Sequence, residues 1–309
     1  MSAQNTRVLP FGPEAVAEAA RLIGEGQPVA VPTETVYGLA ADATNGEAVA
    51  RIYAAKGRPS FNPLIVHVRN LDQATEFTSF DEEACELATR YWPGPLTLIV
   101  PLKENIPIAS LVTAGLATVA VRAPAHPAMQ ALLDAVGRPL AAPSANASGR
   151  ISPTRADHVL ASLGGRIPLI VDAGPTRHGI ESTIVAATGG PLRLLRPGPI
   201  DLGLSVAAAR VIEAPGQLES HYAPEKPLRL DARAAEPGEW LIGFDAVAGD
   251  VSLSPSGDLV EAAARLFALL HEADRQDRPA IAVAPIPEQG LGAAINDRLR
   301  RAAAPRGRG

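Results

Sequence analysis

The sequence has one cysteine, few aromatic residues and no long apolar run. Cys85 is the only cysteine among 309 residues, so neither an intrachain disulfide nor a cysteine-based zinc site can form. We expect Cys85 to be a buried core residue of a helix over 81–91. Aromatic residues make up 4% of the chain, which argues against a protein that reads single-stranded RNA by stacking bases on aromatic rings.

Membrane and nucleic-acid partners are also disfavoured. No stretch reaches about 18 uninterrupted apolar residues, and the first 12 residues contain no apolar segment of signal-peptide length. We therefore expect a soluble, cytoplasmic protein without a membrane partner. The formal net charge is −5, whereas a surface that binds phosphate backbones needs clustered Lys and Arg. We accordingly expect no stable direct nucleic-acid binding, and any basic site must be local.

Several common catalytic motifs are missing. The chain has no G-x-x-x-x-G-K-[ST] loop, no H-E-x-x-H and no G-x-S-x-G. The six histidines are scattered, and none pairs with another at metal-ligand spacing. The sequence therefore predicts no P-loop and no protein-held metal.

The composition is that of a globular protein with many fixed turns: 47% of the residues are hydrophobic, with 27 Gly and 29 Pro. Over residues 1–205, apolar runs predict strands and amphipathic periodicity predicts helices. Several predicted strands follow one another directly, which indicates an α/β domain with a twisted mixed sheet and flanking helices. The strands are expected at 28–31, 64–68, 96–101, 119–122, 140–142, 169–172, 182–186 and 192–195, and the helices at 13–24, 46–55, 81–91, 127–136 and 155–163.

The pattern changes after the first 200 residues. A helical stretch around 202–213 leads into a linker assigned to 206–226, and residues 227–309 predict a smaller, doubly wound, Rossmann-like α/β domain. Its strands are expected at 228–230, 240–244 and 280–284, and its helices at 258–274 and 291–303. The end of the chain is basic, and we expect a frayed, solvated tail, with arginines at Arg298, Arg300, Arg301, Arg306 and Arg308.

Small clusters of polar and basic residues lie at the ends of these elements. Lys56 and Arg58 flank a glycine, an arrangement that suits an anion, although a solvated helix end has the same pattern. The loop 143–152 is rich in Ser and Asn and could hold phosphates or a ribose, or simply cap a helix. Arg122 and Arg196 end predicted strands, where open α/β sheets bind ligands, and His67 in its strand reads more simply as a core histidine. Together these residues suit a small substrate with phosphates and a carboxylate, handled by positioning and charge neutralisation.

Several of these motifs occur in the order typical of one family. The segments Pro32–Leu39, Lys56–Arg58 and Ser144–Asn146, with 182–185 and 196–198, closely resemble the YrdC/Sua family of threonylcarbamoyl-AMP synthases over about residues 10–200. The His-Tyr-Ala-Pro segment at 221–224 and the domain after it resemble the two-domain Sua branch. The resemblance implies condensation of L-threonine with bicarbonate, followed by adenylation with ATP and release of pyrophosphate. The product would pass to a tRNA threonylcarbamoyl transferase that modifies an adenosine beside the anticodon.

The resemblance also implies residue roles. The catalytic residues would be Lys56 and Arg58, with Mg²⁺ carried in by ATP and no metal held by the protein. The threonine site would comprise Thr35, His67, Arg122, Ala142 and Ser182. The ATP site would comprise Lys56, Arg58, Asn62, Thr118, Ser144, Asn146, Ser152, Arg196 and Tyr222.

One segment departs from the family pattern. The family often has basic and aromatic residues just before His-Tyr-Ala-Pro, whereas this chain has Gln217, Leu218, Glu219 and Ser220. We expect Tyr222 to arrive from the linker and close the cleft. The alternative function is a non-catalytic RNA-binding protein of the same fold. The carbamoyl-adenylating relatives of hydrogenase maturation carry Cys-rich zinc modules, which a single cysteine excludes.

Overall fold

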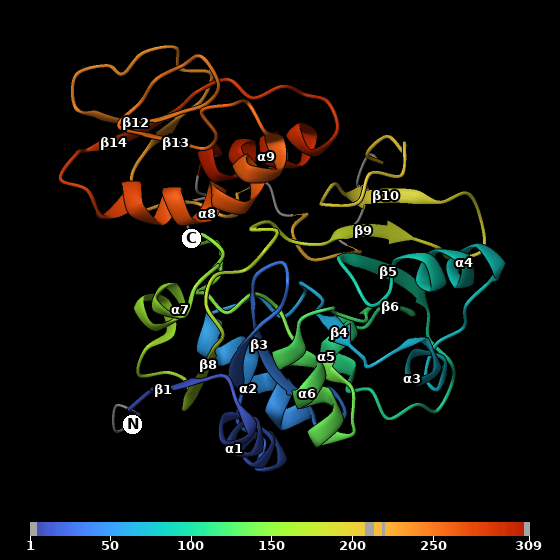
Figure 1. Ribbon diagram of the computed structural model, residues 1–309. Coiled ribbons are helices and arrows are strands. Elements are labelled where there is room, and N and C mark those ends of the chain that lie inside the picture. The colour runs from blue at the N-terminus through green and yellow to red at the C-terminus, as the bar shows by residue number, and fades with distance from the viewer. Residues whose placement is uncertain (1–4, 208–212, 218–219, 306–309) are drawn as a thin grey trace.

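The computed structural model describes residues 5–207, 213–217 and 220–305, which form two sheets (Figure 1). The larger sheet has ten strands in the order β1-β8-β2-β3-β7-β4-β6-β5-β9-β10. These strands are β1 (Arg7–Pro10), β2 (Val29–Pro32), β3 (Tyr37–Asp42), β4 (Ile65–His67), β5 (Leu96–Pro101), β6 (Thr118–Arg122), β7 (Leu140–Ala141), β8 (Leu169–Asp172), β9 (Thr183–Ala186) and β10 (Arg193–Arg196).

The larger sheet mixes both strand directions, as the sequence predicted. Strand β4 runs parallel to β6 and antiparallel to β7, while β5 runs antiparallel to β6 and parallel to β9. The central strands are apolar and fully buried because helices cover them. The helices of this part are α1 (Pro13–Gly24), α2 (Gly46–Lys56), α3 (Leu71–Thr75), α4 (Glu82–Tyr91), α5 (Ser110–Thr113), α6 (Pro127–Val136) and α7 (Ala156–Leu163).

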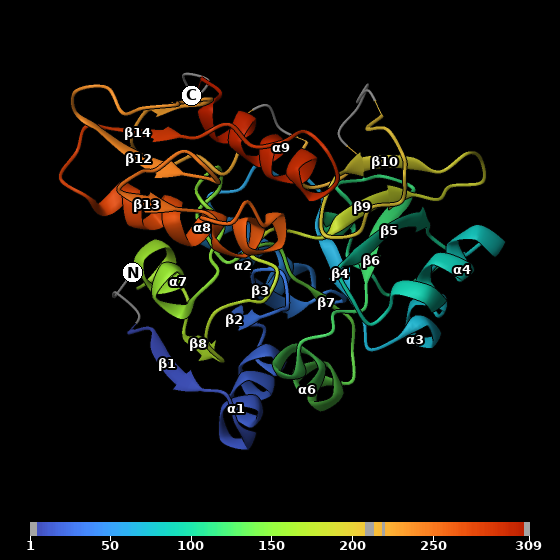
Figure 2. The same cartoon turned by 45° about the horizontal axis from the view of Figure 1, so that its top comes forward.

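The smaller sheet lies at the C-terminal end and is entirely parallel, in the order β11-β14-β12-β13. Its elements are β11 (Leu228–Arg229), β12 (Glu239–Gly243), β13 (Val251–Ser252), α8 (Leu259–Arg275), β14 (Ala280–Val283) and α9 (Leu291–Ala303). Helices α8 and α9 pack together on the face turned toward the larger sheet, as both views show (Figures 1 and 2). The opposite face carries a small cluster of Ala232, Leu241 and Ala282 with Val247. Within the described residues, helices thus cover one face of this parallel sheet, and the predicted doubly wound arrangement is wrong on that point.

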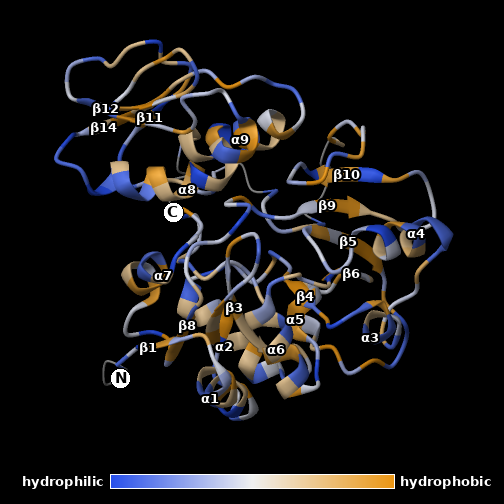
Figure 3. Ribbon diagram, viewed as in Figure 1, coloured by the Kyte–Doolittle hydropathy of each residue, from blue (hydrophilic) through white to orange (hydrophobic). Residues whose placement is uncertain are grey.

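The two parts share one apolar interface. A core cluster joins Val36, Ile151 and Ile180 of the first part to Tyr222 of the linker and to the buried faces of α8 and α9. Most strands are apolar in the hydropathy view, although β10, which begins and ends with arginine, is largely polar, and the helices alternate between polar and apolar residues (Figure 3). Burial of this cluster fixes the C-terminal part against the loops that follow β2, β7 and β8.

Some predictions from the sequence are wrong. Strand β3 was missed because Gly and Ala are weak strand formers, yet all six residues are buried between β2 and β7. Residues 202–207 are not helical, and Val206 instead pairs with Leu194, while the rest of that predicted helix up to 212 lies outside the described residues. Cys85 is only half-buried.

The predicted basic tail is wrong at its first arginine. Arg298 lies inside α9 and its side chain is fully buried, because α9 turns that side of the helix toward the larger sheet. Arg306 and Arg308 lie outside the described residues. No helix in the described ranges combines the length and apolarity needed to cross a membrane.

Candidate functional site

A cavity lies where the ends of several central strands meet the linker, and most of the predicted site residues line it. Its walls come from the turn between β2 and β3, from the ends of β4 and β6, from the loop after β7, and from the segments around β9 and β10. Linker residues complete it. The predicted residues in its lining are Thr35, Arg58, His67, Arg122, Ala142, Ser144, Ser182, Arg196 and Tyr222.

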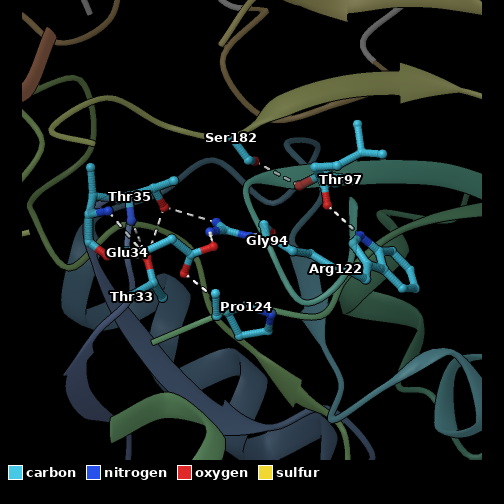
Figure 4. A network of polar contacts seen from close by, with 12 residues as sticks. Thr33, Glu34, Thr35, Gly94, Thr97, Arg122, Pro124 and Ser182 are labelled. Carbon is cyan, nitrogen blue, oxygen red and sulfur yellow. Dashed lines mark hydrogen bonds and ion pairs between the residues drawn. The ribbon is translucent and has the colours of Figure 1, made fainter. Parts of the chain in front are cut away.

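Arg122, at the end of β6, is buried with its guanidinium held from three sides. Its Nε donates to the carbonyl of Gly94 at 3.1 Å, and one terminal nitrogen donates to Thr35 Oγ1 at 2.9 Å. The other terminal nitrogen forms an ion pair with Glu34 at 2.6 Å, and Figure 4 shows the three groups converging. The side chain is therefore fixed in position, and its charge is already balanced by one carboxylate.

Glu34 is the partner that the sequence did not reveal. Its second oxygen accepts a hydrogen bond from the backbone N–H of Ala125 at 3.0 Å. Burial tends to raise the pKa of this carboxyl, but the adjacent Arg122 lowers it below its usual value. Glu34 is consequently charged at neutral pH. The signals in the sequence were its place within the Pro32–Leu39 segment and its position next to Thr35.

His67, at the end of β4, is a neutral polar group in the cavity wall. It pairs with Arg122 across the parallel strands, and its Nδ1 has no hydrogen-bond partner among the described residues. Burial, reinforced by the charge of Arg122, lowers its pKa to about 3. It therefore offers an unsatisfied hydrogen-bonding atom to a ligand, which the simpler interpretation as a satisfied core histidine did not anticipate.

A basic corner is formed at the end of α2. Gly57 ends the helix with a left-handed backbone, φ 59°, and this turn sends the neighbouring cations in different directions. Arg58 lines the cavity, and it donates to the carbonyls of Asn62 at 3.1 Å and Pro63 at 2.8 Å. Burial lowers its pKa to about 10, so it stays charged at neutral pH.

Lys56 points elsewhere. Its Nζ donates to the carbonyls of Ser144 and Asn146, both at 2.5 Å, and it is not part of the cavity lining. Burial, with a further contribution from the charge of Arg58, lowers its pKa well below the usual value. In this structure Lys56 fixes the Ser144–Asn146 loop, and its predicted contact with the phosphates of ATP stays a prediction.

Four other predicted ATP contacts lie outside the lining. Asn62 is buried, and neither atom of its side-chain amide has a partner among the described residues; the side-chain oxygen of Asn146 is likewise unpaired. Ser152 is buried and bonds Glu181 at 2.5 Å. Thr118 begins β6, at the opposite end of the strand from Arg122. Their predicted contacts with ATP stay predictions.

Arg196 and Ser182 form the opposite wall. Arg196 donates to the carbonyl of Ser182 at 3.0 Å and to its hydroxyl at 3.1 Å. The hydroxyl also contacts that of Thr97 at 2.7 Å, as Figure 4 shows. Thr97 lies 85 residues before Ser182 in the chain, and only the parallel pairing of β5 with β9 brings the two together.

The linker closes the cavity with two aromatic residues. His221 and Tyr222 both line it and are buried. The backbone N–H of His221 donates to Arg301 of α9 at 3.1 Å, and that of Ala223 donates to Gly149 at 2.8 Å, so the segment is tied to both parts of the molecule. Gln217 and Ser220 are described, whereas Leu218 and Glu219 lie outside the described residues.

The charged side chains of the cavity favour an anionic ligand. Among the described residues, the lining contains three arginines, Arg58, Arg122 and Arg196, and one carboxylate, Glu181. A second carboxylate, Glu34, is paired with Arg122, so the cations still outnumber the carboxylates. Buried cations in a low-dielectric wall attract anions strongly. No group of three or more His, Cys, Asp or Glu side chains in the part of the chain that the structure describes could hold a metal ion. The arrangement suits an anionic ligand that binds with its phosphates and carboxylate toward the arginines.

Comparison with known proteins gives matches over nearly the whole chain. Residues 21–198 match the Sua5_yciO_yrdC family, described as "Telomere recombination", and residues 180–304 match the C-terminal domain of threonylcarbamoyl-AMP synthase. The threonylcarbamoyl-AMP synthase of Bacillus subtilis is 41% identical over 93% of this chain and 92% of the relative. That of Pyrococcus abyssi is 42% identical over 92% of both, and that of Schizosaccharomyces pombe is 35% identical over 89% of this chain and 85% of the relative.

Solved structures also match this chain over nearly its whole length. Pyrococcus abyssi Sua5 complexed with L-threonine superimposes with a TM-score of 0.89 and 37% identity, covering 96% of this chain and 98% of that one. A variant of the same protein, with a histidine and the tyrosine next to it both replaced by alanine, gives a TM-score of 0.87 and 36% identity over 96% of both chains. His221-Tyr222 is the one His-Tyr pair in the present sequence.

Proposed function

Because this chain belongs to the Sua5, YciO and YrdC family and is similar along its length to threonylcarbamoyl-AMP synthases, we propose that it makes threonylcarbamoyl-AMP from L-threonine, bicarbonate and ATP. It is an enzyme of the nucleotidyltransferase type. The observation that carries the proposal is the convergence of Arg58, Arg122 and Arg196 on one cavity that also contains neutral hydrogen-bonding groups.

We assign the threonine end of the cavity to the region around Arg122. Thr35, His67, Ala142 and Ser182 line the same cavity. Glu34 already occupies one terminal nitrogen of Arg122, so the carboxylate of threonine would use the remaining hydrogens of that guanidinium. A neutral His67 suits this place, because a second cation is not needed and its free Nδ1 can bond the amino acid.

We assign the phosphates of ATP to the wall formed by Arg58 and Arg196, near Ser144. Both arginines are held by carbonyls of the chain, so their charges are fixed before the substrate arrives. Mg²⁺ would enter as part of the MgATP substrate. Lys56 would act indirectly by shaping the loop that carries Ser144, since its Nζ bonds two carbonyls there.

The proposed reaction has two steps. The threonine amine combines with bicarbonate to give a carbamate and water, and a carbamate oxygen then attacks the α-phosphorus of ATP as pyrophosphate leaves. The cavity holds the two anions together against fixed cations, which offsets their repulsion and neutralises charge on the leaving group. The linker residue Tyr222 covers the cavity and would exclude water from the labile product.

The decisive experiment measures pyrophosphate release with MgATP while bicarbonate and single amino acids are added in turn. We expect release only when L-threonine and bicarbonate are both present, and isotopically labelled bicarbonate should appear in the adenylate. Release that is independent of either substrate would refute the proposal. Tight, salt-sensitive binding of tRNA without any threonine-dependent turnover would favour the non-catalytic RNA-binding alternative instead.

The product defines the next step. An acyl adenylate is an activated donor, so we propose that a separate transferase moves the threonylcarbamoyl group to an adenosine of tRNA beside the anticodon. We also propose that the reaction takes place in the cytoplasm, where ATP and tRNA are available. Mixing the enzyme with such a transferase and tRNA should give threonine-dependent modification of the tRNA, and neither protein alone should suffice.

A further inference from the structure

One buried ion pair connects the C-terminal part to the cavity wall. Arg298 of α9 has a fully buried side chain. Its Nε donates to the Glu181 carboxylate at 3.0 Å, and a terminal nitrogen donates to the carbonyl of Pro197 at 2.7 Å. Glu181 lines the cavity. A residue 117 positions away in the sequence thus balances the charge of the one carboxylate in that lining.

Glu181 also contacts Ser152, one of the residues predicted to bind ATP. Its other oxygen accepts a hydrogen bond from the hydroxyl of Ser152 at 2.5 Å, and Ser152 is fully buried. Ser182 follows Glu181 directly in the chain. It belongs to the threonine wall, by which we mean the part of the cavity lining assigned to threonine: Thr35, His67, Arg122, Ala142 and Ser182. Both carboxylate oxygens are therefore engaged, one by the C-terminal part and one by the loop of the first domain.

Arg298 also lies against the linker. Its guanidinium carbon is 5.6 Å from the centre of the Tyr222 ring, within the range of a cation–π contact. Asp297, which is shared with Arg301 at 3.0 Å, also pairs with Arg298, at 2.9 Å. The arginine is thus placed between the linker, the threonine wall and the 143–152 loop, which are the three segments that must be aligned for two substrates to meet.

On the basis of these contacts, and resting on the function proposed above, we propose that Arg298 is a positioning residue that orients Glu181 and, through it, Ser152 for the binding of ATP. It touches no substrate itself. The C-terminal part then has a defined role in the reaction, since it supplies the cation without which Glu181 would be a buried, uncompensated charge next to the nucleotide phosphates.

The test compares Arg298→Met and Arg298→Lys with the control Arg300→Ala. Arg300 lies on the same helix but is exposed, and its ion pair among the described residues is with Glu288 at 2.8 Å. We expect Arg298→Met to raise the KM for ATP at least ten-fold, with a smaller change for L-threonine, and Arg298→Lys to recover part of the loss because a cation remains. Arg300→Ala should match the unmodified protein. A merely structural defect would lower kcat in proportion to the folded fraction and leave the KM for ATP unchanged, and that result would overturn the proposal.

Because Arg298→Met leaves Glu181 unpaired and could unfold the protein, the double variant Glu181→Gln with Arg298→Met is measured beside Glu181→Gln alone. Removing both charges should restore the fold. We expect the double variant to bind ATP no more weakly than Glu181→Gln, because both substitutions break the same chain of contacts from Arg298 through Glu181 to Ser152. Additive losses would contradict the proposal.

A direct measurement of ATP binding tests the role of Arg298 independently of the proposed catalytic activity. Calorimetric titration with a non-hydrolysable ATP analogue measures nucleotide affinity without turnover. If the unmodified protein released no pyrophosphate, the proposed function would fail. The titration would still show whether Arg298 contributes to ATP binding. A ten-fold or greater weakening in Arg298→Met supports the positioning role, and equal affinity refutes it.

Discussion

At the scale of single residues, the site depends on cations whose directions are fixed by the protein before any ligand binds. Arg122 is held by Gly94, Thr35 and Glu34, and Arg58 is held by the carbonyls of Asn62 and Pro63. Arginine suits such places because its planar fork donates in several directions at once, whereas lysine offers a single point charge. This difference can be tested directly.

Replacing Arg122 by lysine should weaken L-threonine binding. Lysine cannot reach Gly94, Thr35 and Glu34 together, so we expect the KM for L-threonine to rise at least ten-fold, with little change for ATP. Loss of two hydrogen bonds should lower the free energy of unfolding by about 1–3 kcal/mol. The matched control is Arg138→Lys, because the Arg138 side chain is half-exposed and lies outside the cavity lining, although its ion-pair partner Asp42 is buried. Equal KM values for threonine in both variants would contradict the assignment.

Replacing Arg58 by glutamine should mainly affect turnover. If Arg58 neutralises charge on the leaving pyrophosphate, kcat should fall by at least a hundred-fold, or about 3 kcal/mol. Steady-state pyrophosphate release measures this. Arg51→Gln is the control, because Arg51 lies in α2, shortly before Arg58 in the chain, and its side chain bonds the backbone of Glu25 and Gly26 outside the cavity. If the kcat of Arg58→Gln stayed within a few-fold of that of the unmodified enzyme, Arg58 would have no catalytic role in pyrophosphate release.

At the scale of elements, the threonine wall depends on how closely two backbone segments approach. Gly198, in the turn after β10, packs against the start of β9. A Cβ placed there would lie 2.7 Å from the carbonyl carbon of Ser182 and 2.8 Å from the carbonyl oxygen of Glu181, and closer still to Thr183 N. The contact atoms are backbone, so the strand itself would have to move.

Gly198→Ala should therefore be costly although it adds one methyl group. We expect a loss of about 1–3 kcal/mol in the free energy of unfolding, together with a higher KM for L-threonine. Urea unfolding and initial rates measure the two effects. Gly190→Ala is the control, since nothing lies within 4 Å of its added Cβ and it should be neutral. Equal free energies of unfolding for the two variants would show that the backbone around Gly198 can move at little energetic cost.

Tyr222 tests the linker as a closing element. The ring is fully buried and adopts φ 63°, a strained conformation for a non-glycine residue. Tyr222→Ala should raise the KM for ATP about ten-fold or more, while Tyr222→Phe, which keeps the packing against Phe267, should preserve the fold. Unchanged ATP kinetics in a folded Tyr222→Ala variant would exclude a role in closing the cavity.

At the scale of the whole molecule, several histidines are buried in the neutral form. His158 of α7 stacks on His271 of α8, with ring centres 3.9 Å apart, so the pair lies where the two parts of the chain meet. Burial lowers the pKa of His158 to about 3 and that of His271 to about 4, and the pKa of His67 is also about 3. In the unfolded chain all three would have a pKa of about 6.5 and would become protonated as the pH falls below that value.

The fold should therefore lose stability in mild acid. Between about pH 6.5 and pH 4 the unfolded state binds more protons than the folded state, so the free energy of unfolding falls as the pH falls. Each such histidine contributes up to about 1.4 kcal/mol per pH unit. Urea unfolding at pH 7.5, 6.5 and 5.5 measures the slope, and the double variant His158→Gln with His271→Gln should flatten it. A stability that does not change over this range would contradict the prediction.

The sequence by itself determined much of this protein. Local periodicity predicted α1, α6 and α9 with the bounds that the structure has, because their apolar faces repeat at helical spacing. The ordered motifs around Thr35, Arg58 and Ser144 pointed to the family. The sequence failed at β3, where burial between two strands overrides the weak strand preference of Gly and Ala.

Only the tertiary structure decided which side chains meet. Glu34 with Arg122, Thr97 with Ser182, and Glu181 with Arg298 are separated by 88, 85 and 117 residues, and no local pattern marks such pairs. The sequence placed Arg298 in a solvated tail because basic residues near a chain end are usually exposed. The fold instead buries it against Glu181, since a buried carboxylate requires a cation and only the packing of α9 on the cavity wall supplies one.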